Sequence, residues 1–308
     1  MLGDAIRVVE TPAPPSRACH SFSTRGYVAR MQLRPRYDVP DFLRFEGPLD
    51  DPSVALLQQR RRLASILAEL DDAQWATPSR CEGWSVQDVI AHLVDANRFW
   101  AISIAAGRSG EPTRYLATFD PVASPAEMVA GVRSLPSAVV LERFVESNDA
   151  IAESVAGLDD DGWSTLGEAP PGHVPLRAVA LHALWDAWIH ERDIALPLGL
   201  AAVEDADEIA GCLRYAAAVS PAFAVAGGST RQGSIVVEAT DPVVRVVVDV
   251  GEAILVHEGD ASTGALHLTG SAVDLLEALS YRMPLRQPVD DEHQWLFSGL
   301  AQVFDREP

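Results

Sequence analysis

The hydrophobic periodicity of the chain changes near residue 200. Before that point, apolar residues recur at helical spacing in segments that begin near Asp51, Ser85, Ser124 and Leu176. After it, short β-rich runs are separated by Asp-Pro, Gly and Ser turns, with helical patterns on either side. The change predicts an α+β chain: an N-terminal four-helix bundle over 51–200, then a smaller α+β domain with an antiparallel sheet over 201–308.

Capping signals and helix breakers set the expected boundaries. Asp51 precedes Pro52, and Ser85 stands three residues before Asp88; both patterns are typical of a helix start. The expected bundle helices cover 52–71, 85–106, 124–157 with a break or kink at Pro136, and 176–196. The stretch 159–175 is expected to be a loop. Beyond it we expect helices over 204–218, 271–282 and 292–304, and an antiparallel meander over 233–240, 243–250, 253–257 and 264–269.

Residues 1–50 are expected to form an irregular N-terminal arm, rich in proline and arginine. Its first 36 residues hold six arginines against two acidic residues, whereas the whole chain has a formal net charge of −20. Three interpretations stay open: an arm that docks on the acidic body, a disordered leader, or a true start at Met31.

The composition disfavours several classes of protein. The net charge of −20 disfavours nucleic acid and anionic membrane surfaces as partners. No apolar run reaches the roughly 18–20 residues that span a bilayer, and no secretory signal is recognisable, so a cytoplasmic location is expected. The chain contains no lysine, which excludes Schiff-base chemistry and a Walker-type nucleotide site.

The three cysteines form no recognisable sequence motif. Cys19, Cys81 and Cys212 are widely spaced and odd in number, so neither a disulfide framework nor a C-x-x-C metal pair is predicted. No histidine is close to Cys81 in sequence, and a structural, buried cysteine is expected there. Thiol chemistry in this chain would then need a thiol supplied from outside.

His182, Asp186 and His190 stand four residues apart and share one face of the expected helix over 176–196. Tryptophan and aliphatic residues flank this stripe, so much of it should be buried. Buried carboxylates and imidazoles are costly unless they are paired or bound to metal. If His92 of the second expected helix packs against the stripe, the chain has a three-ligand metal site with an open position.

Simpler interpretations of these residues stay open. Asp186 and His190 can form a helix-face ion pair, and His92 alone can be a packing residue. If a metal is bound, two histidines and one carboxylate describe a catalytic zinc site and also the facial triad of non-haem iron. Zinc is favoured, because the iron triad normally includes an H-x-D pair and the chain has none.

Two stretches resemble signatures of the mycothiol-dependent maleylpyruvate isomerase family, within the DinB-like metal-binding four-helix bundles. They are Cys81-Glu-Gly-Trp-Ser-Val-Gln-Asp-Val-Ile-Ala-His-Leu93 and Trp185-Asp-Ala-Trp-Ile-His-Glu-Arg-Asp-Ile194. A third, Gly270-Ser-Ala-Val-Asp-Leu-Leu-Glu-Ala-Leu-Ser-Tyr-Arg282, resembles a helix of the family's second domain. The resemblance covers about residues 52 to 305.

This resemblance implies that His92, Asp186 and His190 are the metal ligands, although the usual carboxylate at the middle position is Glu. Asp193 is then expected to orient the ring of His190. His182 lies beside the ligands, either behind them or facing the substrate, and is an expected catalytic residue.

The other expected catalytic residue lies in the second domain. Arg282 matches the position of the arginine that anchors the substrate carboxylate in the family. Tyr281 replaces the glycine that usually precedes this arginine, and Arg286 is the alternative anchor.

The implied activity is a metal-dependent isomerase or S-transferase, in which a low-molecular-weight thiol, mycothiol, enters the open position of the metal and attacks a small electrophile. A non-catalytic binding or regulatory protein of the same fold is an alternative. A metal-dependent hydrolase with His182 or Asp193 as its base is another. The residues leave open the identity of the electrophile and the oligomeric state.

Overall fold

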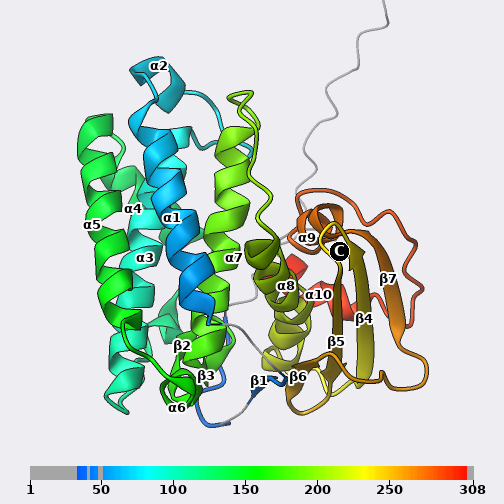
Figure 1. Cartoon of the computed structure of the whole chain (residues 1–308). Helices are drawn as coiled ribbons and strands as arrows, with labels where there is room; N and C mark the ends of the chain where they lie inside the picture. The colour runs from blue at the N-terminus through cyan, green and yellow to red at the C-terminus, as the bar shows by residue number, and fades with distance from the viewer. Residues whose placement is uncertain (1–32, 40–41, 48–50, 304–308) are drawn as a thin grey trace, which may run out of the picture. The chain divides into compact units, whose positions relative to one another are not determined.

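Four long helices form the bundle in the computed structural model, which describes residues 33–39, 42–47 and 51–303 (Figure 1). They are α1 (Pro52–Ala68), α3 (Val86–Arg108), α5 (Ser137–Val155) and α7 (Leu176–Ala195). Helices α1 and α3 each contact both α5 and α7, so the four helices surround one core. The expected bundle is therefore present, and the basic residues of the first 30 positions lie outside the described residues.

Two helix starts follow the expected capping chemistry, whereas α4 (Ala123–Val132) begins one residue before the expected Ser124, without a side-chain cap. Asp51 caps α1 with Pro52 at the first helical position, and Ser85 and Asp88 form a reciprocal capping box at the start of α3. Pro136 divides the third expected helix into α4 and α5, because proline cannot donate the hydrogen bond that a continuous helix needs. Two other short helices, α2 (Asp72–Trp75) and η1 (Tyr115–Thr118), lie in the connections.

The expected loop over 159–175 is more ordered than its proline content suggested. It contains α6 (Asp160–Ser164) and an antiparallel hairpin of β2 (Leu166–Ala169) and β3 (Gly172–Pro175). The fully buried carboxylate of Glu168 accepts hydrogen bonds from the hydroxyls of Tyr37 and Thr113, both at 2.6 Å. This carboxylate fastens part of the N-terminal arm and the segment after α3 to the hairpin.

A five-stranded sheet follows the bundle in sequence, in the order β1-β6-β5-β4-β7. Its strands are β1 (Leu43–Phe45), β4 (Gly233–Thr240), β5 (Val244–Val250), β6 (Ile254–His257) and β7 (Leu266–Ser271). The expected antiparallel pairing holds for β4, β5 and β6. The meander does not continue to β7, which pairs in parallel with β4, because β1 of the arm occupies the other edge of β6.

Three helices accompany the sheet: α8 (Ala206–Ala226), α9 (Ala272–Leu279) and α10 (Trp295–Val303). Helix α8 runs further than the expected 204–218 and contacts α7, α10 and the strands β5 and β6. Its length and apolar composition would allow it to cross a membrane, but 78% of its most apolar window is buried inside the protein. The core between α7 and α8 continues into the apolar side chains of the strands.

Candidate metal centre

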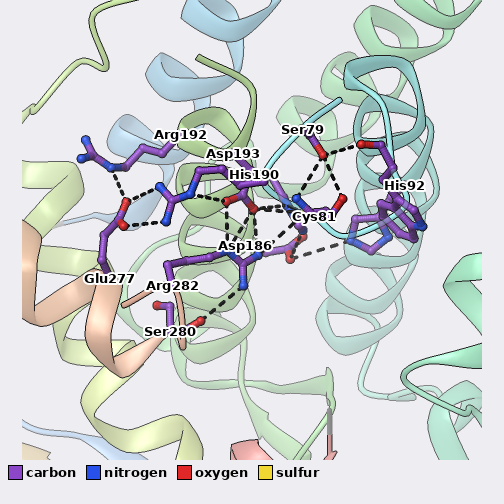
Figure 2. A network of polar contacts seen from close by, with 12 residues as sticks. Ser79, Cys81, His92, Asp186, His190, Arg192, Asp193, Glu277, Ser280 and Arg282 are labelled. Atoms are coloured by element: carbon purple, nitrogen blue, oxygen red, sulfur yellow. Dashed lines mark hydrogen bonds and ion pairs between the residues drawn. The ribbon is translucent and has the colours of Figure 1, made fainter. Parts of the chain in front are cut away.

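Three donor atoms converge between α3 and α7 (Figure 2). The Oδ1 atom of Asp186 lies 3.6 Å from Nε2 of His190 and 3.9 Å from Nε2 of His92. All three donor atoms lie within 4.8 Å of one another. In a tetrahedral zinc site with bonds of about 2.0–2.2 Å, ligand atoms are roughly 3.3–3.6 Å apart. The two distances to Asp186 are close to this range, so the three residues can hold a divalent cation once His92 moves inward.

The helices explain why these atoms meet. Asp186 and His190 are one turn apart on α7, and His92 lies on α3, which contacts α7. The side chains of His92, Asp186 and His190 remain 21%, 18% and 11% exposed, so the site is not completely enclosed. Trp84 contacts the ring of His92, with ring centroids 5.5 Å apart.

The second nitrogen of His190 has a partner of its own. Its Nδ1 atom lies 3.1 Å from Oδ2 of Asp193, a carboxylate that is fully buried. This is the contact expected from the i, i+3 spacing. It orients the ring so that Nε2 faces Asp186, the arrangement that metal-bound histidines commonly show.

The electrostatics of the centre favour a cation. Burial disfavours the charged carboxylate of Asp186, but His92 and His190 outweigh burial and hold the pKa of Asp186 well below its usual range. Burial also lowers the pKa of His190, but Cys81 and the Asp193 carboxylate outweigh it and raise this pKa to about 10. The negative groups around His190 favour a positive charge here, either a proton on the ring or a metal ion that displaces it.

Cys81 lies in this centre, which the sequence interpretation missed. Its Sγ atom is half-buried, 3.2 Å from Oδ2 of Asp193 and 3.6 Å from Nδ1 of His190. No histidine is close to Cys81 in sequence, so no contact with a histidine was expected. The histidine that Cys81 approaches in the fold, His190, stands 109 residues away in the chain. A second cation beside Cys81 and Asp193 is disfavoured, since the guanidinium of Arg282 lies 2.7 Å from Asp193 and 3.9 Å from Cys81.

Arg282 reaches the centre from the residues that follow α9. It donates from Nε and Nη2 to Asp193, at 2.9 Å and 2.7 Å, and its Nη1 lies 3.4 Å from the carbonyl oxygen of Ser280 (Figure 2). Tyr281 has a φ of 58°, the left-handed conformation that favours glycine. This explains why a glycine suits the position. Arg286 is mostly exposed and pairs with Asp274 at 2.8 Å, away from the ligands.

A chain of ion pairs extends from Arg282 along α7 and α9. Arg80 donates to Glu277 through two nitrogens, at 2.9 Å and 2.7 Å, and its Nε lies 3.6 Å from Asp193. Glu277 also accepts from Arg192 at 2.7 Å. The sequence interpretation did not identify Arg80 or Glu277, whose partners are close only in the folded chain.

His182 lies outside the set of convergent donors. Its ring is buried one turn before Asp186, and its Nδ1 atom lies 2.5 Å from the hydroxyl of Tyr215 on α8. Trp100 and Trp185 contact the same ring, with centroids 4.6 Å and 5.3 Å away. Burial lowers the pKa of His182 to about 4, with a smaller opposing effect of Asp186, so the ring is neutral near pH 7.

Comparison with known proteins finds a matching family for the helical part of the chain. Residues 56–195 match the family model of the mycothiol maleylpyruvate isomerase N-terminal domain. The helical bundle belongs to this domain family. The bundle thus confirms the resemblance that its two sequence signatures predicted, and it contains all three convergent donors.

Solved structures support the same fold. Two crystal structures of the mycothiol-dependent maleylpyruvate isomerase, one of them of a mutant, match with a TM-score of 0.55 and 18% sequence identity. Each comparison covers 77% of this chain and 90% of the other, so the likeness of fold extends beyond the bundle. A search of curated protein sequences found no match.

Proposed function

We propose that this chain is a divalent-metal-dependent isomerase that uses a low-molecular-weight thiol, mycothiol, as its co-substrate. The observation that carries the proposal is the convergence of His92, Asp186 and His190 at a partly exposed edge of a mycothiol maleylpyruvate isomerase N-terminal domain. Two histidines and one carboxylate leave a coordination position for an outside ligand, as in catalytic zinc sites. Zinc is the proposed metal, and reduced cytoplasm the proposed location.

The chain's own residues have distinct parts in this proposal. A divalent cation, when bound, supplies a Lewis acid that lowers the pKa of a thiol at neutral pH. Asp193 holds the ring of His190 through Nδ1, so that Nε2 stays directed at Asp186. Cys81 is not the attacking thiol in this proposal, because its Sγ faces Asp193 and the opposite nitrogen of His190.

Arg282 is the proposed anchor for a carboxylate of the substrate. Asp193 fixes one end of its guanidinium through two nitrogens, and Nη1 has a weaker contact at 3.4 Å. The side chain is 19% exposed, and Nη1 is the nitrogen that Asp193 leaves free for a substrate carboxylate in this proposal. A guanidinium held on one side by a buried carboxylate is a preorganised partner for a second carboxylate on the other side.

The proposed reaction is a cis–trans isomerisation of a conjugated acid. The thiolate sulfur forms a bond to one carbon of the activated double bond, and the former π pair moves onto the conjugated carbonyl oxygen. Rotation about the resulting single bond follows. The electron pair then returns, the carbon–sulfur bond breaks, and the sulfur leaves as the thiolate, so no thiol is consumed. In an S-transferase the adduct would be released instead.

The proposal is tested with zinc-loaded protein, mycothiol and maleylpyruvate. We expect isomerisation that requires both metal and thiol and consumes no thiol, and its loss in Asp186→Ala and His190→Ala. His257→Ala is the matched control, because His257 pairs with Asp249 on the sheet, away from the centre. Stoichiometric loss of thiol would indicate an S-transferase, and turnover in thiol-free buffer a hydrolase. Binding of thiol without turnover of this or other conjugated acids would indicate a binding protein.

A further inference from the structure

The buried pair of His182 and Tyr215 is not explained by packing alone. His182 is 7% exposed and Tyr215 is fully buried, and they meet through Nδ1 and the phenolic hydroxyl at 2.5 Å. The two residues come from α7 and α8, 33 positions apart. Among the described residues, no side chain or backbone group hydrogen-bonds the Nε2 atom of His182, and this atom is not one of the fully enclosed polar atoms without a partner, which are Oε1 of Gln59 and the indole nitrogens of Trp100, Trp163 and Trp188.

The direction of this hydrogen bond follows from the needs of the tyrosine. The hydroxyl of Tyr215 is buried, and burial raises its pKa well above the usual value, so it keeps its proton. If Nδ1 of His182 carried a proton and donated it, the phenolic proton would have no acceptor among the described residues. A buried unsatisfied donor costs about 1–3 kcal/mol. The hydroxyl therefore donates to Nδ1, and the proton of the neutral imidazole is on Nε2.

We infer that Tyr215 is a positioning residue that fixes His182 as a neutral imidazole with Nε2–H as a free donor, directed to the carbonyl or carboxylate oxygen of an electrophile bound beside Asp186. The inference rests on the proposed function for the identity of that electrophile. His182 stands one helical turn from Asp186 on the same face of α7, and the two side chains interact electrostatically. Tyr215 lies on α8, outside the helices that carry the three proposed metal ligands, so the spacing of those ligands does not point to it.

This donor matches the charge that develops in the proposed reaction. When sulfur adds to a conjugated carbonyl compound, the displaced π pair accumulates on the carbonyl oxygen. A preorganised neutral donor stabilises that oxygen without transferring its proton, and it keeps its hydrogen when the pair returns. The tryptophan rings of Trp100 and Trp185 against His182 exclude water from its faces, which strengthens such a hydrogen bond.

The tautomer can be measured directly. Long-range proton–nitrogen NMR spectra of zinc-loaded protein with labelled histidine distinguish a protonated from an unprotonated ring nitrogen, and His182→Gln assigns the signal among the eight histidines. We expect the wild-type ring of His182 to carry its proton on Nε2 alone near pH 7. In Tyr215→Phe, which removes only the hydroxyl, we expect both tautomers. A proton on Nδ1 in the wild type, or an unchanged ring in the variant, would overturn the inference.

Kinetics give a second readout. With maleylpyruvate and mycothiol as probes, Tyr215→Phe should lower kcat about tenfold, the effect of one weakened hydrogen bond, with little change in KM or bound zinc. Tyr37→Phe is the matched control, since it removes a hydroxyl that bonds to the buried Glu168 elsewhere in the protein. Equal kcat in the wild type and Tyr215→Phe contradicts the inference. Absence of thiol-dependent turnover in the wild type contradicts the proposed function, while the NMR result still decides the tautomer.

Discussion

The Nδ1 atom of His190 lies 3.1 Å from Oδ2 of Asp193, on the side of the ring opposite to Asp186. One carboxylate therefore faces each nitrogen of this histidine. In Asp193→Asn the ring loses a charged acceptor that orients it and raises its basicity. We expect the affinity for zinc to fall by roughly 10–100-fold, measured by competition with a chromogenic chelator.

A neighbouring carboxylate provides the control for this prediction. Glu277→Gln also removes a negative charge from the network of ion pairs, but Glu277 contacts Arg80 and Arg192 and not the ligands. We expect its affinity for zinc to stay within about threefold of the wild type. Equal losses in both variants would mean that overall charge, and not orientation of His190, sets the affinity.

The stability of the fold should depend on pH through His182. Burial lowers the pKa of this ring from its usual value near 6.5 to about 4 in the folded protein. In this pH range the unfolded state binds more protons at this residue than the folded state does. The stabilisation is therefore complete above pH 6.5 and is lost as the pH falls towards 4, at up to about 1.4 kcal/mol per pH unit.

Denaturant unfolding at several pH values between 6.5 and 4 tests this dependence. We expect the wild type to lose stability over this interval more steeply than His182→Gln, which has no titrating ring. The difference between the two proteins removes the contribution of the carboxylates that also titrate there. Parallel curves for the two proteins would show that His182 is not buried as a neutral ring.

Arg60 connects three bundle helices near the metal centre. Its buried guanidinium donates to Oδ1 of Asn97 on α3 at 2.9 Å and 3.1 Å, and to the carbonyl oxygen of Ala183 on α7 at 3.1 Å. Arg60→Met leaves both acceptors without this donor, so we expect a loss of about 2 kcal/mol in the free energy of unfolding. Arg61→Met, on the exposed face of the same helix, should change stability by less than about 0.5 kcal/mol.

The bundle was largely predictable from the sequence because its signals are local. Ser85 and Asp88 cap α3 through contacts three residues apart, and the break between α4 and α5 follows from Pro136 itself. The place of β7 was not predictable in this way. Its position beside β4 depends on the strand Leu43–Phe45, which comes from an arm without periodicity and occupies the edge of β6.

The residues of the site also divide into those that local spacing reveals and those that only the folded chain brings together. Helical spacing relates Asp186 to His190 and His190 to Asp193, and the family resemblance adds His92 and Arg282. Cys81 and Arg80 could not be placed from spacing, because they approach α7 from a connector more than 100 positions earlier in the chain. The role of Tyr215 depends on the packing of α8 against α7, for which no sequence motif was available.

Metal stoichiometry tests the central claim most directly. Protein purified without chelator and equilibrated with zinc should hold one tightly bound equivalent per chain in the wild type, by elemental analysis after dialysis. His190→Ala should hold almost none, because the two remaining donors cannot retain the ion. His257→Ala should match the wild type. Equal zinc in the wild type and His190→Ala, or none in either, would contradict a metal centre formed by His92, Asp186 and His190.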